Sequence, residues 1–84
     1  MKPARLSGHA RGQLWYRGTT EEEIEGAIRT EGWAPAELGR LECRKDSPFG
    51  KEWNGKLYGT KQVRPIFVEE EREIVVVTVY TYYF

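Results

Sequence analysis

The sequence predicts an α+β domain in which two N-terminal helices pack on an antiparallel sheet of about four strands. Three observations support this. Helix-capping signals precede two amphipathic segments within residues 7–31. From residue 41 onward the pattern changes to the alternation that is typical of strands. The length of 84 residues, with 39% hydrophobic and 31% charged residues, fits one domain that spans residues 1–84.

The first helix is expected between Ser7 and Arg17. Ser7 can accept a hydrogen bond from a free amide at the helix start, and Gly18 can adopt the left-handed conformation that ends a helix. Because consecutive residues are turned by about 100°, four polar side chains fall close together on its surface. They belong to His9, Gln13, Tyr16 and Arg17. These side chains border the apolar edge of the helix and are candidates for a site.

The second helix has the clearest local signal. Thr20 and Glu23 form a capping box, in which each side chain bonds the backbone amide of the other residue. Gly32 is suited to end the helix. A buried helical stripe lies between, formed by Ile24, Ala27 and Ile28. Capping explains the three glutamates at residues 21–23, so we assign them no catalytic role.

The middle of the chain predicts one strand, one turn and one hairpin. Leu41 and Cys43 alternate with charged residues, as in a strand with one buried face. Residues 46–50, Asp-Ser-Pro-Phe-Gly, are rich in turn formers. Asn54 and Gly55 are the residue types that a two-residue hairpin loop prefers, because both tolerate positive φ.

The last third of the chain predicts two strands joined by an acidic turn. In the first strand, residues 61–68, Pro65 favours an edge position or a bulge. After the turn at residues 69–73, residues 74–83 read IVVVTVYTYY, which is typical of a central strand. We expect the helices to cover one face of the sheet. The other face then stays partly open, and a site would lie there.

Composition limits the classes of function. One cysteine, Cys43, excludes an internal disulfide and is expected in the core. Because the chain has only one cysteine and one histidine, we expect no metal site and no cofactor. No segment approaches the ~20 apolar residues of a membrane-spanning helix, and residues 1–6 lack the apolar core of a signal peptide. We therefore expect a cytoplasmic protein that does not bind membranes.

The formal net charge is zero, but the charges alternate in blocks. Residues 1–18 carry four basic residues and no acidic one, and residues 40–64 carry seven basic and three acidic residues. The blocks 19–39 and 65–84 are acidic. If the two basic blocks meet in the fold, they form one basic face. If they do not, they are ordinary solvated surface.

Four short motifs span most of the chain: Ser-Gly-His-Ala at residues 7–10, Arg-Gly at 17–18, Thr-Glu-Glu-Glu-Ile at 20–24 and Val-Thr-Val-Tyr at 77–80. In this order they resemble a family of short prokaryotic domains of unknown function. The family is similar in layout to RelE-like and BrnT-like toxins, which are small ribonucleases of toxin–antitoxin pairs. The resemblance covers about residues 6–80, although the segment 33–53 follows none of the family's motifs.

The resemblance implies a barnase/RelE-like α+β sheet, metal-independent RNA cleavage and an antitoxin protein as partner. It also assigns positions. The family's opening histidine, its arginine before glycine, its basic strand residue and the two hydroxyl residues of its last strand correspond to His9, Arg17, Arg64, Thr78 and Tyr80.

These residue types fit RNA cleavage without a metal. His9 suits proton transfer because imidazole titrates near neutral pH. Arg17 and Arg64 suit bidentate binding of a phosphate. Thr78 and Tyr80 share one strand face, where either hydroxyl could hold the phosphate or the histidine. Further candidates for RNA contact are Lys61, Tyr16 and Gln13, and candidates for base stacking are Tyr80, Tyr82, Trp53 and Tyr58.

Each candidate also has an ordinary structural interpretation. His9 suits an exposed helix start, Lys61 a strand surface, Thr78 a central strand and Tyr80 a core. We expect a toxin-like endoribonuclease, with two alternatives. One is a non-catalytic module that binds RNA or protein on the open sheet face, and the other is a homodimer paired through that face. Convergence of His9, Arg17 and Arg64 in one cleft would favour the enzyme.

Overall fold

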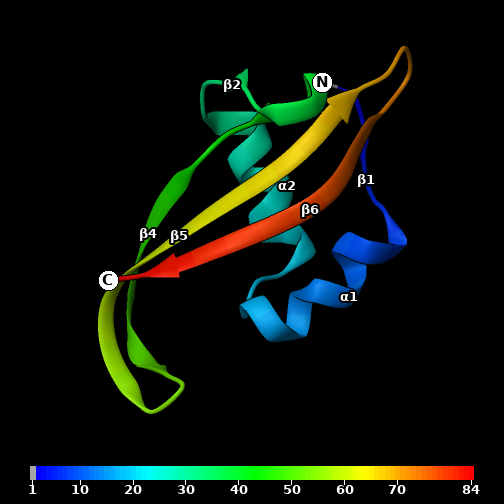
Figure 1. Ribbon diagram of the computed structural model, residues 1–84. Helices are drawn as coiled ribbons and strands as arrows, with labels where there is room; N and C mark the ends of the chain where they lie inside the picture. The colour runs from blue at the N-terminus through cyan, green and yellow to red at the C-terminus, as the bar shows by residue number, and fades with distance from the viewer. Residues whose placement is uncertain (1) are drawn as a thin grey trace.

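The computed structural model describes residues 2–84, in which two α-helices lie against a mixed sheet (Figure 1). The α+β class with helices on a sheet is therefore confirmed. The elements in chain order are β1 (Ala4–Leu6), α1 (Gly8–Arg17), α2 (Glu21–Thr30), β2 (Ala34–Pro35), the 3-10 turn η1 (Glu37–Gly39), β3 (Leu41–Glu42), β4 (Lys45–Trp53), β5 (Lys56–Glu69) and β6 (Ile74–Tyr83).

The sheet has more strands than the sequence predicts. Over residues 2–84 its six strands follow the order β1-β6-β5-β3-β2, and β4 also pairs with β5. β1 runs parallel to β6, whereas the other pairs are antiparallel. The prediction of about four strands, all antiparallel, is therefore wrong. The strands that the sequence does not indicate are β1 and β2, which have three and two residues and are too short for a periodic pattern to show.

Both helices have the predicted caps. The Ser7 side chain accepts a hydrogen bond from the amide three residues later, and Gly18 ends α1 with φ of 68°. Thr20 and Glu23 form the capping box of α2. α2 ends at Thr30, two residues before the expected glycine.

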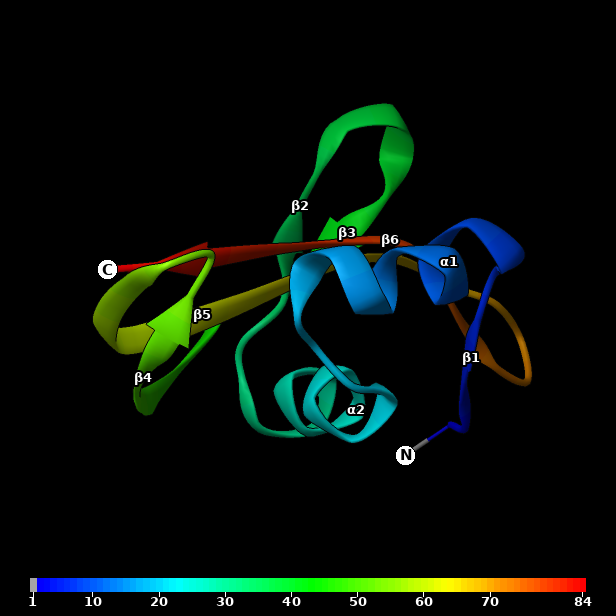
Figure 2. The same ribbon diagram turned by 90° about the horizontal axis from the view of Figure 1, so that it is seen from below.

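The two helices occupy different positions on the sheet (Figure 2). α2 lies beneath one face, and α1 runs beside β6. The core lies between these layers, and Cys43 belongs to it as predicted. Burial raises the pKa of the Cys43 thiol to about 11, which suits a structural rather than a reactive cysteine. The other core residues are Leu6, Ala10, Ile24, Ala27, Ile28, Val63, Phe67, Ile74, Val76 and Val79.

A bulge in β6 decides which side chains reach the open face. Phe67 pairs with Val76, but Ile66 pairs with Thr78, so Val77 is an extra residue on β6. The extra residue reverses the alternation of the strand. Before the bulge, even-numbered residues enter the core, and after it odd-numbered residues do so. The open face therefore receives Thr78, Tyr80 and Tyr82.

Two local predictions differ from the structure. The expected turn at residues 46–50 lies inside β4, because pairing with β5 overrides the local turn preference. The turn-forming residues coincide with an irregularity of β4, a register shift between Pro48 and Lys51. Of the two alternatives predicted for Pro65, the edge position is wrong, since β5 pairs on both sides, but a bulge is present in the next step of the β5–β6 ladder, between Ile66 and Phe67. Pro65 lies opposite the unpaired residues 43–44 between β3 and β4, where the ladder is already interrupted.

The hairpin turn, the acidic turn and the last strand are confirmed, whereas the strand expected at residues 61–68 is continuous with the second arm of the hairpin in β5. Asn54 and Gly55 have φ of 52° and 82°, as a type I′ hairpin turn requires. The acidic turn joins β5 to β6, and β6 covers residues 74–83 as expected. β6 lies between β1 and β5 in the sheet.

Lys61 lies between the layers instead of on an RNA-accessible surface. Its side chain is only 7% exposed, and its Nζ donates to Glu23 Oε1 at 2.9 Å. The same ammonium donates to the carbonyl of Gly18. Lys61 thus ties β5 to the end of α1 and the start of α2. Because its charge is used inside the protein, we assign it no RNA contact.

Replacing Lys61 tests this structural role. Lys61→Met keeps the apolar stem but leaves the Gly18 carbonyl and Glu23 without their donor. We expect the free energy of unfolding, measured with urea, to fall by about 2 kcal/mol. Lys56→Met, on the exposed start of the same strand, is the control and should change it by less than ~0.5 kcal/mol. Equal losses in the two variants would contradict the assignment.

Candidate functional site

The open face of the sheet carries a groove of about 570 Å³. Its wall is the segment from β2 through η1 to β3, which rises from the face opposite α2 (Figure 2). Its floor is formed by β5 and β6, through Arg64, Ile66, Thr78 and Tyr80. Three of these four residues are site candidates from the sequence, and they come from two neighbouring strands.

Tyr80 lies between two guanidinium groups. The Cζ atom of Arg17 is 5.3 Å from the centre of the ring, and that of Arg64 is 5.5 Å from it. Arg64 pairs directly with Tyr80 in the β5–β6 ladder, whereas Arg17 reaches the ring from the end of α1. Cations are attracted to aromatic rings in this arrangement. The structure therefore brings Arg17, Arg64 and Tyr80 together.

Arg64 is held in place by a carboxylate. Its Nε donates to Glu42 Oε2 at 2.6 Å, and its second guanidinium nitrogen donates to Oε1 at 3.2 Å. The remaining nitrogen donates to the Tyr82 hydroxyl at 3.2 Å. These hydrogen bonds raise the pKa of Arg64 and lower that of Glu42. Arg64 is thus held in place by Glu42, whose Oε2 also accepts a hydrogen bond from Arg44 Nε at 3.4 Å.

Arg17 has a different environment. Its backbone carbonyl accepts hydrogen bonds from Thr81 Oγ1 at 2.6 Å and from the Tyr83 hydroxyl at 2.7 Å. No carboxylate of residues 2–84 forms an ion pair with its side chain, and its shielded Nε has no hydrogen-bond partner among them. Arg17 is therefore the cation of this cluster whose charge is not compensated.

Gln13 and Thr78 form a hydrogen bond with each other. Gln13 Oε1 accepts from Thr78 Oγ1 at 2.6 Å and from the backbone amide of Val79 at 3.1 Å. β1 pairs only with residues 74–76 of β6, so the backbone of β6 beyond them has no strand partner within residues 2–84 on that side. Gln13 gives the Val79 amide an acceptor there. The two hydrogen bonds of Gln13 fix α1 along β6, so Gln13 positions the site.

His9 does not line the groove. It is exposed near the start of α1, and no residue of 2–84 forms a hydrogen bond with its ring. It stands one helical turn before Gln13, which stands one turn before Arg17, so the three residues follow one side of α1. Arg17 does not line the groove either, although its guanidinium group approaches the Tyr80 ring. Of the three residues expected to converge in one cleft of an enzyme, only Arg64 lies in this groove.

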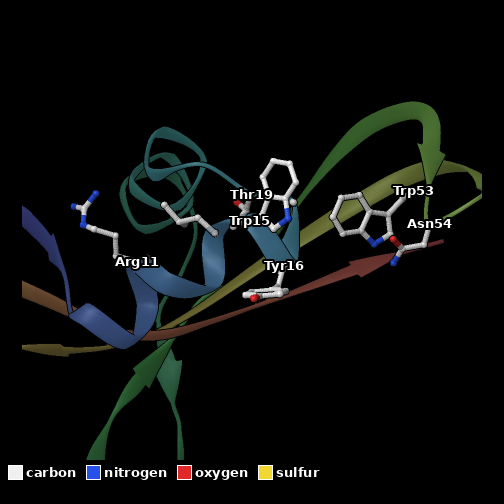
Figure 3. A pocket seen from close by; sticks show the side chains of 8 residues that line it. Arg11, Trp15, Tyr16, Thr19, Trp53 and Asn54 are labelled. Carbon is white, nitrogen blue, oxygen red and sulfur yellow. The ribbon is translucent and has the colours of Figure 1, made fainter.

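Two residues of interest were missed by the sequence analysis. Glu42 compensates Arg64, and the only signal for it was its place between Leu41 and Cys43, which turns it away from the core. Trp15 is exposed beside Tyr16, and both line a second cleft between α1 and the β4–β5 hairpin (Figure 3). Tyr16 therefore lies away from the groove.

Neither a metal-ligand cluster nor a membrane-spanning helix is found among the described residues. Within residues 2–84, no group of three or more His, Cys, Asp or Glu side chains could hold a metal ion. None of the helices described has the length and apolar character needed to cross a membrane.

Comparisons of this chain with protein-family models, with curated proteins and with solved structures gave no match.

The Glu42–Arg64 pair predicts how stability depends on pH. Arg64 lowers the pKa of Glu42 in the folded state from the ordinary 4.5, so the pair stabilises the fold above that pH. The stabilisation is lost as the pH falls through the lowered pKa. Glu42→Gln should reduce the free energy of unfolding by about 1 kcal/mol near neutral pH.

The measurement is urea unfolding of both proteins over a series of acidic pH values. The difference between wild type and Glu42→Gln should shrink below pH 4.5. A difference that stays constant through this range would show that the Glu42 charge is not what stabilises the wall of the groove.

Proposed function

We propose that this domain binds single-stranded RNA through the open face of its sheet. The observation that carries the proposal is the surroundings of Tyr80. An exposed aromatic ring on a strand inside the sheet lies between two guanidinium groups, and Arg17 has no carboxylate partner within residues 2–84. Unstacked bases bind to aromatic rings and guanidinium planes, while basic side chains bind the phosphates.

The open face extends this arrangement along β6. Tyr82 is the next residue on the same face, about 7 Å further along the strand, and its ring is also exposed. Two rings at this spacing suit two successive unstacked bases. The wall formed by β2, η1 and β3 limits the groove on one side, so a strand of RNA would enter along β6.

A toxin-like endoribonuclease, active without a metal and inhibited by an antitoxin protein, is the second candidate. The observation that favours it is the line of His9, Gln13 and Arg17 along one side of α1, fixed to β6 through Gln13. His9 would take the proton of a 2′-hydroxyl, whose oxygen attacks phosphorus. The bond to the 5′-oxygen then breaks, and that oxygen takes a proton from water. Arg17, two helical turns further along α1, would bind another phosphate of the same RNA and hold the strand along the helix.

RNA binding is tested with a labelled oligouridine and fluorescence anisotropy. Tyr80→Ala removes the stacking surface and should weaken binding about tenfold, because one base–aromatic stack is worth ~1–3 kcal/mol. Arg17→Ala should weaken binding and lower the slope of log K against log salt by roughly 0.7, the value for one phosphate of a single strand. Circular dichroism checks that both variants fold.

The matched control for Arg17→Ala is Arg29→Ala, which removes one exposed positive charge from α2 on the opposite face of the sheet. It should leave the affinity nearly unchanged. Equal weakening by the two arginine variants would mean that RNA binds without using the open face.

Cleavage is tested with the same RNA in EDTA. If the domain is a ribonuclease, His9→Ala should slow cleavage by about 100-fold or more, since general acid–base catalysis contributes 10²–10⁴-fold. Arg29→Ala, an exposed change on α2, is the control and should keep the rate. Cleavage that His9→Ala does not slow would exclude the assigned role of His9. Absence of cleavage by every protein would leave RNA binding alone.

A further inference from the structure

A second cleft, of about 780 Å³, lies between the end of α1 and the β4–β5 hairpin. α1 contributes Trp15 and Tyr16, and the hairpin contributes Trp53 and Asn54. Figure 3 shows the indole rings of Trp15 and Trp53 on opposite sides of the cleft, with the Tyr16 ring at its edge. The volume is in the range of pockets that hold small ligands.

The aromatic rings of α1 have no role in the core. Trp15 is 86% exposed and Tyr16 is 79% exposed, although they are among the largest side chains of the domain. Exposed aromatic side chains that gather in one cleft are typical of a binding surface. Their removal should therefore affect a ligand more than the fold.

Trp53 is held in place by contacts with Tyr83 and Gly18. Its ring stacks on Tyr83, with centres 4.9 Å apart and planes 18° from parallel. Its edge lies against Gly18, where a Cβ atom would overlap the indole. The hydroxyl of Tyr83 in turn donates to the carbonyl of Arg17. Trp53 is thus fixed before any ligand binds, which lowers the entropic cost of binding.

The two elements that flank the cleft carry more positive than negative charge. The tip of the hairpin has Lys51 and Lys56 against Glu52, although none of these three side chains lines the cleft. α1 contains no acidic residue. On the hairpin, the ammonium groups of Lys51 and Lys56 lie over aromatic rings, and neither forms an ion pair with a carboxylate of residues 2–84. Arg11 is turned away from the indoles toward Glu21, at 3.3 Å (Figure 3).

We infer that this cleft binds a nucleobase of single-stranded RNA, stacked on the rings of Trp15 and Trp53. The inference rests on the proposed function and adds a second contact to it. Asn54 also lines the cleft and supplies an amide that can bond the edge of a base, whereas the Thr19 hydroxyl is buried and donates to Glu23 Oε1 at 3.3 Å. Two facing indoles, with the Asn54 amide beside them, fit a flat base with polar edges better than an apolar peptide side chain.

The cleft and the open face are connected through α1. Tyr16 borders the cleft, and the next residue, Arg17, reaches Tyr80 on the open face. An RNA strand that stacks on Tyr80 can therefore pass Arg17 at the edge of β6 and place a following base in the cleft.

Tryptophan fluorescence reports directly on such stacking, with oligouridine and oligoadenine as probes. Of the three tryptophans in the sequence, Trp33 packs edge-on against Phe67 and donates to the Ile28 carbonyl, so it should not respond. We expect RNA to quench the fluorescence of the wild type and of Trp33→Phe. Trp15→Phe should keep only the part of the quenching that comes from Trp53.

Affinity gives the second readout. Trp15→Ala should weaken oligouridine binding about tenfold with an unchanged urea midpoint, because the side chain is exposed. Leu57→Ala removes another exposed apolar side chain of the hairpin strand, outside the cleft, and should keep the wild-type affinity.

The outcomes separate this inference from the proposed function. If Tyr80→Ala weakens binding but Trp15→Ala does not and quenching is absent, the cleft proposal fails and the open-face proposal stands. If Trp15→Ala weakens binding and Tyr80→Ala does not, the open-face proposal fails and the cleft proposal stands. If neither RNA binds, both fail. If sedimentation shows a wild-type dimer that Trp15→Ala dissociates, a second copy occupies the cleft and the inference is overturned.

Discussion

The rest of the structure depends on how the end of α1 is held against the sheet. The last carbonyls of a helix have no partner within it, and here the Arg17 and Gly18 carbonyls accept hydrogen bonds from Thr81, Tyr83 and Lys61. The ammonium of Lys61 also offsets the negative end of the helix dipole. Both proposed surfaces are built on this junction. It aims the side chain of Arg17 at Tyr80 on one side and presents the aromatic rings of α1 to the hairpin on the other.

The bulge at Val77 is the second constraint on the site. With strict alternation from the start of β6, Thr78 and Tyr80 would enter the core together with Val76. The extra residue turns them to the open face and sends Val79 inward instead. Bulges re-aim side chains in this way at many binding sites. A strand that is apolar on both faces at its start can therefore present tyrosines to solvent near its end.

Features fixed by local chemistry could be predicted from the sequence, and features fixed by distant partners could not. The capping box of α2 and the turn at Asn54 need only neighbouring residues. In contrast, β4 forms across turn-forming residues because β5 supplies its hydrogen bonds. Lys61 is buried because Glu23 and a carbonyl meet it from other elements. At the site, the face shared by Thr78 and Tyr80 followed from alternation, but the carboxylate that compensates Arg64 could not be seen.

The two arginines of the open face have different surroundings, which bears on the proposed cleavage. Arg64 is fixed by its carboxylate, so it shapes the groove, whereas Arg17 is available to a phosphate. His9 lies eight residues before Arg17, a rise of ~12 Å along α1. A general base must approach its proton within ~3 Å. The phosphate held by Arg17 is therefore not the one on which His9 would act. Cleavage would need a longer RNA that runs along α1 from one residue to the other, whereas binding on the open face needs only the bases that stack on Tyr80 and its neighbour.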